Sequence, residues 1–198
     1  MKKVGLFFGT FNPIHVGHLV IANYMADYTD LDEVWLVVTP QNPFKEKQSL
    51  LNDIHRLTLV RVATEDNTKL KVSNIEFELP KPSFTCDTLA YLSEKYPENK
   101  FVLIMGEDNL RTFHKWKNYE YIINHHELYV YPRVIEKHEK ELTKAEILSH
   151  PNLKKIEEVP IMQISASFIR EGIKNKKDVR YLLTEKVYQY IDEMNFYR

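Results

Sequence analysis

The sequence has a single cysteine, Cys86, among its 198 residues. One thiol cannot form an internal disulfide, which is typical of proteins kept in a reducing compartment. Gly-x-Ser-x-Gly is absent, and no nucleophile signature surrounds the cysteine. Because the chain shows no recognisable covalent nucleophile, any group transfer that it catalyses is expected to run directly between two bound substrates.

Glycine is also scarce, with five residues in the chain. None of them forms the Gly-x-x-x-x-Gly-Lys-Ser/Thr segment of P-loop proteins. No Gly-x-Gly-x-x-Gly follows the first apolar run, as it does in dinucleotide-binding folds. Both of these ways of holding a nucleotide are therefore disfavoured.

Long apolar runs and an excess of charge are missing as well. No run reaches membrane-spanning length, and the apolar residues after Lys2 and Lys3 end at Asn12, so no signal peptide is expected. The net charge is −1, which argues against a nucleic-acid or membrane partner. We therefore expect a cytoplasmic protein, and composition leaves open whether it forms a homo-oligomer.

Short apolar runs alternate with amphipathic segments along the chain, which predicts an α/β fold with a parallel sheet covered by helices on both faces. The expected strands are Val4–Phe8, Glu33–Thr39, Lys71–Phe77, Phe101–Met105, Glu127–Tyr131 and Lys154–Glu158. The expected helices are His18–Tyr28, Asn52–Glu65, Thr85–Lys95, Trp116–Asn124, Ser165–Lys174 and Thr184–Phe196. The length fits one domain, residues 1–198, with a helical part at about 165–198.

Some local details are expected within that pattern. Asp53 is a candidate N-cap for the second helix, and Ser83 or Thr85 for the third. The charged segment Glu136–Leu148 predicts a peripheral helix or a mobile loop. In a parallel sheet, ligands bind beyond the carboxyl ends of the strands. The loops that follow Phe8, Thr39, Phe77 and Met105 are therefore the places to look for a site.

The most informative segment is Gly9–His18, between the first strand and the first helix. Small residues at such a turn point backbone N–H groups at one spot, which the helix dipole makes attractive to phosphate. His15 and His18 share the first-turn face, where imidazoles can donate hydrogen bonds to developing negative charge. Two other interpretations of the histidines remain open. They could bind zinc, although the sequence offers no further ligands in suitable spacing, or they could have the structural role of capping the helix and packing against it.

Three side chains in the later loops are candidates for nucleotide contacts. Lys45 follows the second strand and is either a phosphate contact or a solvated lysine. Asp108, just after Gly106, sits at a helix start, where it either caps the helix or accepts from a ribose. Trp116 either packs in the core or stacks on a heteroaromatic ring.

The segment Ile164–Arg170 offers a second helix start. Ser165 is the expected N-cap, and Ile164 and Phe168 are expected to form a hydrophobic staple. Arg170 in the next turn presents a guanidinium to an anion, or else lies exposed at the surface.

Two of these segments resemble the paired signatures of the nucleotidyltransferase superfamily. His15-Val16-Gly17-His18 is similar to its (T/H)-x-G-H motif, and Ile164–Arg170 to its Ile-Ser-x-Ser/Thr-x-Ile-Arg motif. Pro40–Lys45, Pro82–Leu89 and Gly106–Leu110 with Trp116 then resemble the nicotinate-nucleotide adenylyltransferase family within that superfamily.

The resemblance implies a Rossmann-like fold and transfer of AMP from ATP to nicotinate mononucleotide, giving nicotinate adenine dinucleotide and pyrophosphate. It implies catalytic roles for His15, His18 and Arg170. The implied ATP contacts are Gly9, Thr10, Phe11, His15, His18, Gly106, Asp108, Ile164, Ser167 and Arg170. The implied mononucleotide contacts are Asn12, Lys45, Phe84, Thr85, Asp108 and Trp116. Mg²⁺ is implied as the cofactor, bound mainly through phosphate oxygens and water rather than by a protein metal site.

The chain departs from the family pattern at four positions. Phe8 replaces a common glycine, Asn12 a frequent aspartate and Ser167 a common threonine. Glu107 stands where a small residue is usual and is expected to add negative charge near the substrates. The alternatives are a related enzyme acting on nicotinamide mononucleotide or phosphopantetheine, and a nucleotide-binding sensor without turnover. The chain is too short to include the usual anticodon-binding part of an aminoacyl-tRNA synthetase, and it lacks the basic surface that tRNA binding requires, so this class is disfavoured.

Overall fold

The computed structural model describes residues 1–40, 50–133 and 143–198 of the chain. Its centre is a six-stranded, fully parallel sheet in the order β3-β2-β1-β4-β5-β6. The strands are β1 (Lys2–Gly9), β2 (Glu33–Val38), β3 (Leu70–Ser73), β4 (Asn99–Gly106), β5 (Glu127–Tyr131) and β6 (Leu153–Lys155). The order reverses direction between β1 and β4, which places the topological switch point at their carboxyl ends.

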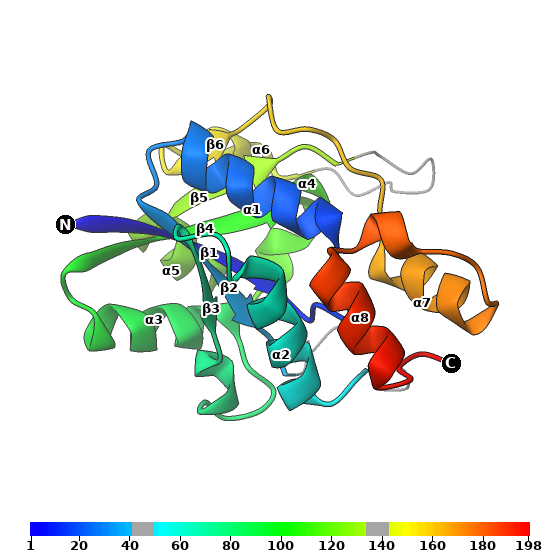
Figure 1. Cartoon of the computed structure of the whole chain (residues 1–198). Coiled ribbons are helices and arrows are strands. Elements are labelled where there is room, and N and C mark those ends of the chain that lie inside the picture. Colours follow the sequence, from blue (N-terminus) through cyan, green and yellow to red (C-terminus); the bar gives the residue numbers. More distant parts are fainter. Residues whose placement is uncertain (41–49, 134–142) are drawn as a thin grey trace.

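Helices cover both faces of the sheet (Figure 1). The α-helices are α1 (Val16–Tyr28), α2 (Asp53–Thr64), α3 (Thr85–Lys95), α4 (Glu107–Thr112), α5 (Tyr119–His125), α6 (Ala145–Leu148), α7 (Ala166–Lys174) and α8 (Glu185–Glu193). Single 3₁₀ turns occur at Ile75–Phe77, Phe113–Lys115 and Arg180–Leu182. This is the predicted α/β architecture.

The core has two parts, one on each face of the sheet. One part joins the sheet to α1, α2, α7 and α8, and the other joins it to α3, α4, α5 and α6. Within β4, Val102 and Ile104 face the first part, whereas Leu103 and Met105 face the second. Side chains alternate in this way because successive residues of a strand point to opposite faces. In the part of the chain that the structure describes, no helix is long and apolar enough to cross a membrane.

The expected strand Lys71–Phe77 is wrong in its second half. β3 ends at Ser73, and Ile75–Phe77 forms a 3₁₀ turn. The buried Glu76 carboxylate accepts hydrogen bonds from Ser83 Oγ (3.1 Å) and Thr88 Oγ1 (2.8 Å). These contacts turn the chain out of the sheet toward the start of α3.

Other boundaries differ by a few residues. β6 is shorter and earlier than the expected Lys154–Glu158, α5 begins at Tyr119 rather than Trp116, and α8 ends at Glu193 rather than Phe196. At Asn118 and Asn195 the backbone takes positive φ values of 52° and 56°, which interrupt helical geometry. Of the charged segment 136–148, residues 143–148 are described, and the last four form α6.

The capping predictions are confirmed once and wrong twice. Ser165 caps α7, since its side chain accepts from Phe168 N–H at 3.2 Å. Asn52 rather than Asp53 caps α2, and the N-cap of α3 is Phe84 rather than Ser83 or Thr85. The expected staple is also wrong, because the Phe168 side chain is exposed and Ile169 is the buried residue.

Candidate active site

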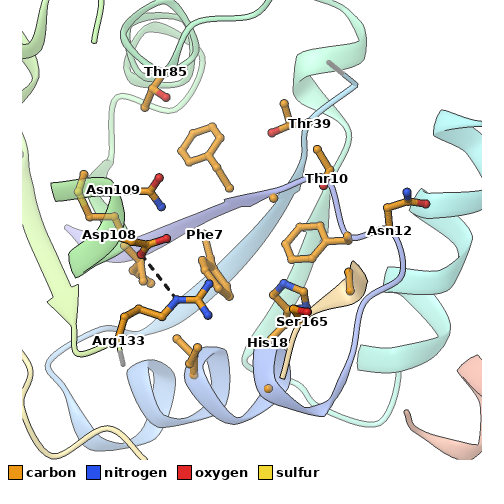
Figure 2. Close-up of a pocket in the computed structure, with 18 of the residues that line it drawn as sticks. Phe7, Thr10, Asn12, His18, Thr39, Thr85, Asp108, Asn109, Arg133 and Ser165 are labelled. Atoms are coloured by element: carbon orange, nitrogen blue, oxygen red, sulfur yellow. Dashed lines mark ion pairs between the residues drawn. The ribbon is translucent and has the colours of Figure 1, made fainter. Parts of the chain in front are cut away.

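A cavity of about 810 Å³ opens beyond the carboxyl ends of β1 and β4 (Figure 2). It lies at the switch in strand order, where open parallel sheets bind their ligands. Thirteen of the fifteen site residues expected from the sequence line it: Gly9, Thr10, Phe11, Asn12, His15, His18, Phe84, Thr85, Asp108, Trp116, Ile164, Ser167 and Arg170.

Of the other two expected residues, Gly106 is not among the residues that line the cavity. Gly106 ends β4 between the lining residues Met105 and Asp108, and a Cβ there would collide with the Asp108 carboxylate. Lys45 lies outside the described residues.

The turn after β1 is shaped by one glycine and one phenylalanine. A Cβ on Gly9 would lie 2.8 Å from the Phe11 ring, so the ring occupies the space that a side chain would need. Phe11 is buried and has a φ of 45°, a left-handed conformation that is uncommon for a bulky residue. Such strain is characteristic of functional turns that the surrounding structure holds in place.

The two histidines at the start of α1 are stacked, with ring centroids 3.7 Å apart. The backbone N–H of His15 donates to Nδ1 of His18 at 3.3 Å. Since Nδ1 is the acceptor, the proton of a neutral His18 ring must be on Nε2. His18 therefore has the tautomer that a hydrogen-bond donor to phosphate requires.

His15 is almost fully buried, with 5% of its surface exposed. Burial, and to a smaller extent the positive charge of nearby Arg133, together lower the pKa of its imidazole to about 4. His15 is therefore uncharged at neutral pH. Among the described residues its buried Nδ1 has no hydrogen-bond partner.

Arg170 connects α7 to the turn after β1, although the two lie far apart in the sequence. Its Nη1 donates to the backbone carbonyl of Asn12 at 2.7 Å, and its Nη2 donates to Ser167 Oγ at 3.2 Å. Arg170 is therefore not a free surface side chain, and the two sequence motifs meet at one place.

Asp108 and Arg133, which both line the cavity, form an ion pair, with Arg133 Nε 3.6 Å from Asp108 Oδ1. In the view of Figure 2, the pair lies between Thr85 and His18. Asp108 Oδ1 is buried and has no hydrogen bond within the described residues. Asp108 therefore does not cap α4, since the N-cap of that helix is Gly106.

Arg133 is a lining residue that the sequence reading missed. It follows β5 by two residues, so it lies in a loop at the carboxyl end of a strand. Ligands bind beyond the carboxyl ends of parallel strands, and this loop follows such a strand just as the four earlier loops do. The expected strand Glu127–Tyr131 therefore already indicated the loop that contains Arg133.

The far end of the cavity is lined by aromatic and charged side chains. Trp116 packs edge-on against Phe113, with centroids 5.5 Å apart. Lys117 Nζ lies 4.8 Å from the centroid of the Phe84 ring and pairs with Asp87 at 2.9 Å. The Phe84 side chain has no polar atom with which to cap α3. The Asp87 N–H donates to the Phe84 carbonyl at 3.0 Å, so the N–H groups at the very start of the helix, those of Thr85 and Cys86, are the ones that can face an anion.

Asn12 has its side-chain oxygen engaged by the protein. Oδ1 accepts from Leu51 N–H at 3.2 Å and from Tyr197 O–H at 2.8 Å. These bonds give Asn12 a part in holding the turn, which the sequence reading did not anticipate.

Two of the departures from the family pattern have different outcomes. Phe8 lines the cavity, so a large side chain does stand beside the turn. Glu107 is not among the described lining residues, and its carboxylate lies 3.9 Å from Lys155 Nζ on β6. The negative charge expected from Glu107 is therefore placed opposite Lys155 and not on the described wall of the cavity.

Comparison with known proteins agrees with this geometry. The cytidylyltransferase-like family model matches residues 6–172. The chain is 56% identical to a Flavobacterium johnsoniae protein, over 99% of both chains. It is 57% identical to a Christiangramia forsetii protein, over 100% of this chain and 99% of that one. Both relatives are described as probable nicotinate-nucleotide adenylyltransferases. The chain belongs to the nicotinate-nucleotide adenylyltransferase family.

The fold of this nucleotidyltransferase is shared with distant members of the family. A solved Plasmodium falciparum nicotinic acid mononucleotide adenylyltransferase, complexed with NaAD, matches it with a TM-score of 0.78 at 18% identity. The match covers 100% of this chain and 98% of the other. At this identity the likeness concerns the fold alone.

The state of His15 in this adenylyltransferase can be measured directly. We expect its ring resonances to titrate with a midpoint near pH 4 in histidine-labelled NMR spectra. Arg133→Gln should raise that midpoint, because it removes a repelling positive charge. The midpoint should still stay below the ordinary 6.5, because burial is the larger cause.

The exposed Arg61 on α2 provides the control for that titration. Arg61→Gln should leave the His15 midpoint unchanged. A wild-type midpoint close to 6.5 would contradict the buried, neutral His15 that the structure shows.

Proposed function

We propose that this cavity binds ATP and nicotinate mononucleotide side by side and transfers AMP from the first to the second. The products are nicotinate adenine dinucleotide and pyrophosphate. The contact between Arg170 and the turn after β1 supports this assignment most directly, because it brings the (T/H)-x-G-H segment and the second motif to one cavity. The family of the chain supports the same reaction.

The triphosphate would lie between α1 and α7. Gly9 and Thr10 line this part of the cavity, and the amino-terminal ends of both helices supply N–H groups and a favourable dipole. His18 donates from Nε2 to the phosphate oxygens on which negative charge develops. Ser167 and Arg170 bind the departing pyrophosphate, since a guanidinium matches phosphate geometry.

The mononucleotide would lie toward α3. Trp116 stacks on the pyridine ring, and the first turn of α3 at Phe84 and Thr85 offers N–H groups to the carboxylate. Asp108 lies between the two ends and accepts from a ribose hydroxyl. A carboxylate and a neutral amide differ by one charge, so the same donors favour nicotinate over nicotinamide.

The reaction needs no protein nucleophile in this proposal. The phosphate of the mononucleotide attacks the α-phosphorus of ATP, and pyrophosphate leaves on the opposite side. Such a transfer depends on positioning and on charge stabilisation. Neutral His15, donor His18 and cationic Arg170 provide both without forming a covalent intermediate.

Mg²⁺ is the proposed cofactor. A metal held mainly by phosphate oxygens and water needs few protein ligands. The donor set fits that mode, since Asp108 lines the cavity as a carboxylate and its buried Oδ1, which pairs with Arg133 Nε at 3.6 Å, makes no hydrogen bond within the described residues. When bound, the ion would offset phosphate charge, with Asp108 available to its water shell.

One assay tests the reaction and its alternatives together. Pyrophosphate release from ATP is measured with nicotinate mononucleotide, nicotinamide mononucleotide and phosphopantetheine in parallel. We expect the highest kcat/KM with nicotinate mononucleotide. A preference for either other acceptor would replace the proposed substrate, and binding of ATP without turnover would indicate a sensor.

His18→Ala tests the donor to phosphate. We expect kcat to fall by about 10²- to 10⁴-fold, the usual loss when a positioned donor or acid–base group is removed. His125→Ala is the matched control, because His125 is exposed at the end of α5. Near-normal kcat in a folded His18→Ala protein would remove His18 from the mechanism.

Trp116→Ala tests stacking on the pyridine ring. We expect the KM for nicotinate mononucleotide to rise roughly tenfold, since aromatic stacking is worth about 1–3 kcal/mol, while the KM for ATP changes little. Trp116→Phe keeps a ring and should retain most of the affinity. Equal losses for both substrates would contradict the assignment.

A further inference from the structure

The turn after β1 has a strained shape that other parts of the protein must hold. Phe11 adopts a left-handed φ of 45° while its side chain is fully buried. A residue in this conformation persists when its surroundings leave it no relaxed alternative. The hydrogen bonds on either side of Phe11 are therefore functionally important.

Arg56 holds the peptide that precedes Phe11. Its side chain is completely buried, and its Nη1 donates to the carbonyl oxygens of Thr10 (2.5 Å) and Thr39 (2.8 Å). Nη2 of the same guanidinium bonds to the Asp53 carboxylate at 2.5 Å. This side of the turn is thus fixed to the ends of β1 and β2.

Asn12 holds the other side of Phe11. Its backbone carbonyl accepts from Arg170, and its side-chain oxygen accepts from Leu51 N–H and from the phenol of Tyr197. The Tyr197 hydroxyl makes the shorter of these two bonds to Asn12 Oδ1, 2.8 Å against 3.2 Å from Leu51 N–H. The hydroxyl therefore helps to fix the direction of the Asn12 side chain.

The segment after α8 places Tyr197 at this position. Phe196 N–H donates to Ile191 O at 3.0 Å, and the Phe196 ring packs against His55 of α2 with centroids 4.8 Å apart. Arg198 Nη1 bonds to Asn195 Oδ1 at 2.6 Å. The backbone of Tyr197 has a φ of 64°, so the phenol is delivered by an ordered, non-helical tail.

We propose that Tyr197 is a positioning residue for the triphosphate, acting through Asn12 on the turn after β1. This inference rests on the proposed function, in which that turn binds ATP phosphates. The hydroxyl holds Asn12, Asn12 fixes the peptides around Phe11, and those peptides determine where the phosphate sits relative to His18. Small misplacements of reacting groups are costly to turnover.

Tyr197→Phe is the decisive variant, because it removes one hydroxyl and keeps the ring. We expect kcat to fall roughly tenfold, which corresponds to about 1.4 kcal/mol in the barrier. The KM for nicotinate mononucleotide should change less than about twofold, because the variant keeps the Asn12 side chain and the pyridine ring is bound by Trp116 and the start of α3 at the other end of the cavity. An unchanged kcat would overturn the inference.

Tyr190→Phe is the matched control. Tyr190 lies on α8, and its hydroxyl bonds to His55 Nδ1 of α2 at 3.0 Å. Tyr190→Phe removes a tyrosine hydroxyl bond of similar length to the one between Tyr197 and Asn12, but this bond joins α8 to α2 and makes no contact with the turn after β1. We expect a similar loss of thermal stability in both variants, but a fall in kcat in Tyr197→Phe alone. Equal falls in kcat would show a structural role and overturn the inference.

A double-mutant cycle tests the route through Asn12. If Tyr197 acts through Asn12, Tyr197→Phe should cause no further fall in kcat when added to Asn12→Ala. If the fall in kcat of the double variant equals the product of the two single falls, the inference is overturned. If Asn12→Ala does not fold, the comparison between Tyr197→Phe and Tyr190→Phe decides. Absence of pyrophosphate release by the wild-type protein would instead reject the proposed function.

Discussion

The Arg56 guanidinium, buried with no access to water, is the interaction on which the site end of the sheet depends. Burying a charge is costly unless it is fully paired, and here the carbonyls of Thr10, Thr39, Pro40 and Leu51 and the Asp53 carboxylate accept its N–H groups. Burial lowers the pKa of Arg56, but an arginine stays protonated, so the charge persists. One side chain thereby fixes the ends of β1 and β2 and the start of α2 together.

The sheet could be predicted because its strands are buried on both faces and read as continuous apolar runs. The run Lys71–Phe77 shows where this reasoning fails. Ile75 and Phe77 look like strand residues, yet the buried Glu76 between them is bound by Ser83 and Thr88. A segment of this composition can form either a strand or a turn. Contacts with residues farther along the chain decide between the two, and the local pattern of apolar residues carries no information about such contacts.

In the candidate site, too, some residues could be predicted from the sequence and others could not. His15, His18 and Arg170 stand in dense motifs, and the structure gathers them around one cavity. Arg56 and Tyr197 belong to no recognisable motif. In the sequence, neither residue can be told from any other arginine on a helix or any other tyrosine after one. Their importance comes from partners 46 and 185 residues away. Such long-range bonds become visible only in three dimensions.

The distance between Asn12 and its anchors has a consequence for biosynthesis. The turn after β1 is made early, whereas Arg170 and Tyr197 follow 158 and 185 residues later. On the ribosome, all six strands precede both anchors. A nascent chain can therefore assemble its sheet while the candidate site still lacks the two side chains that hold its turn.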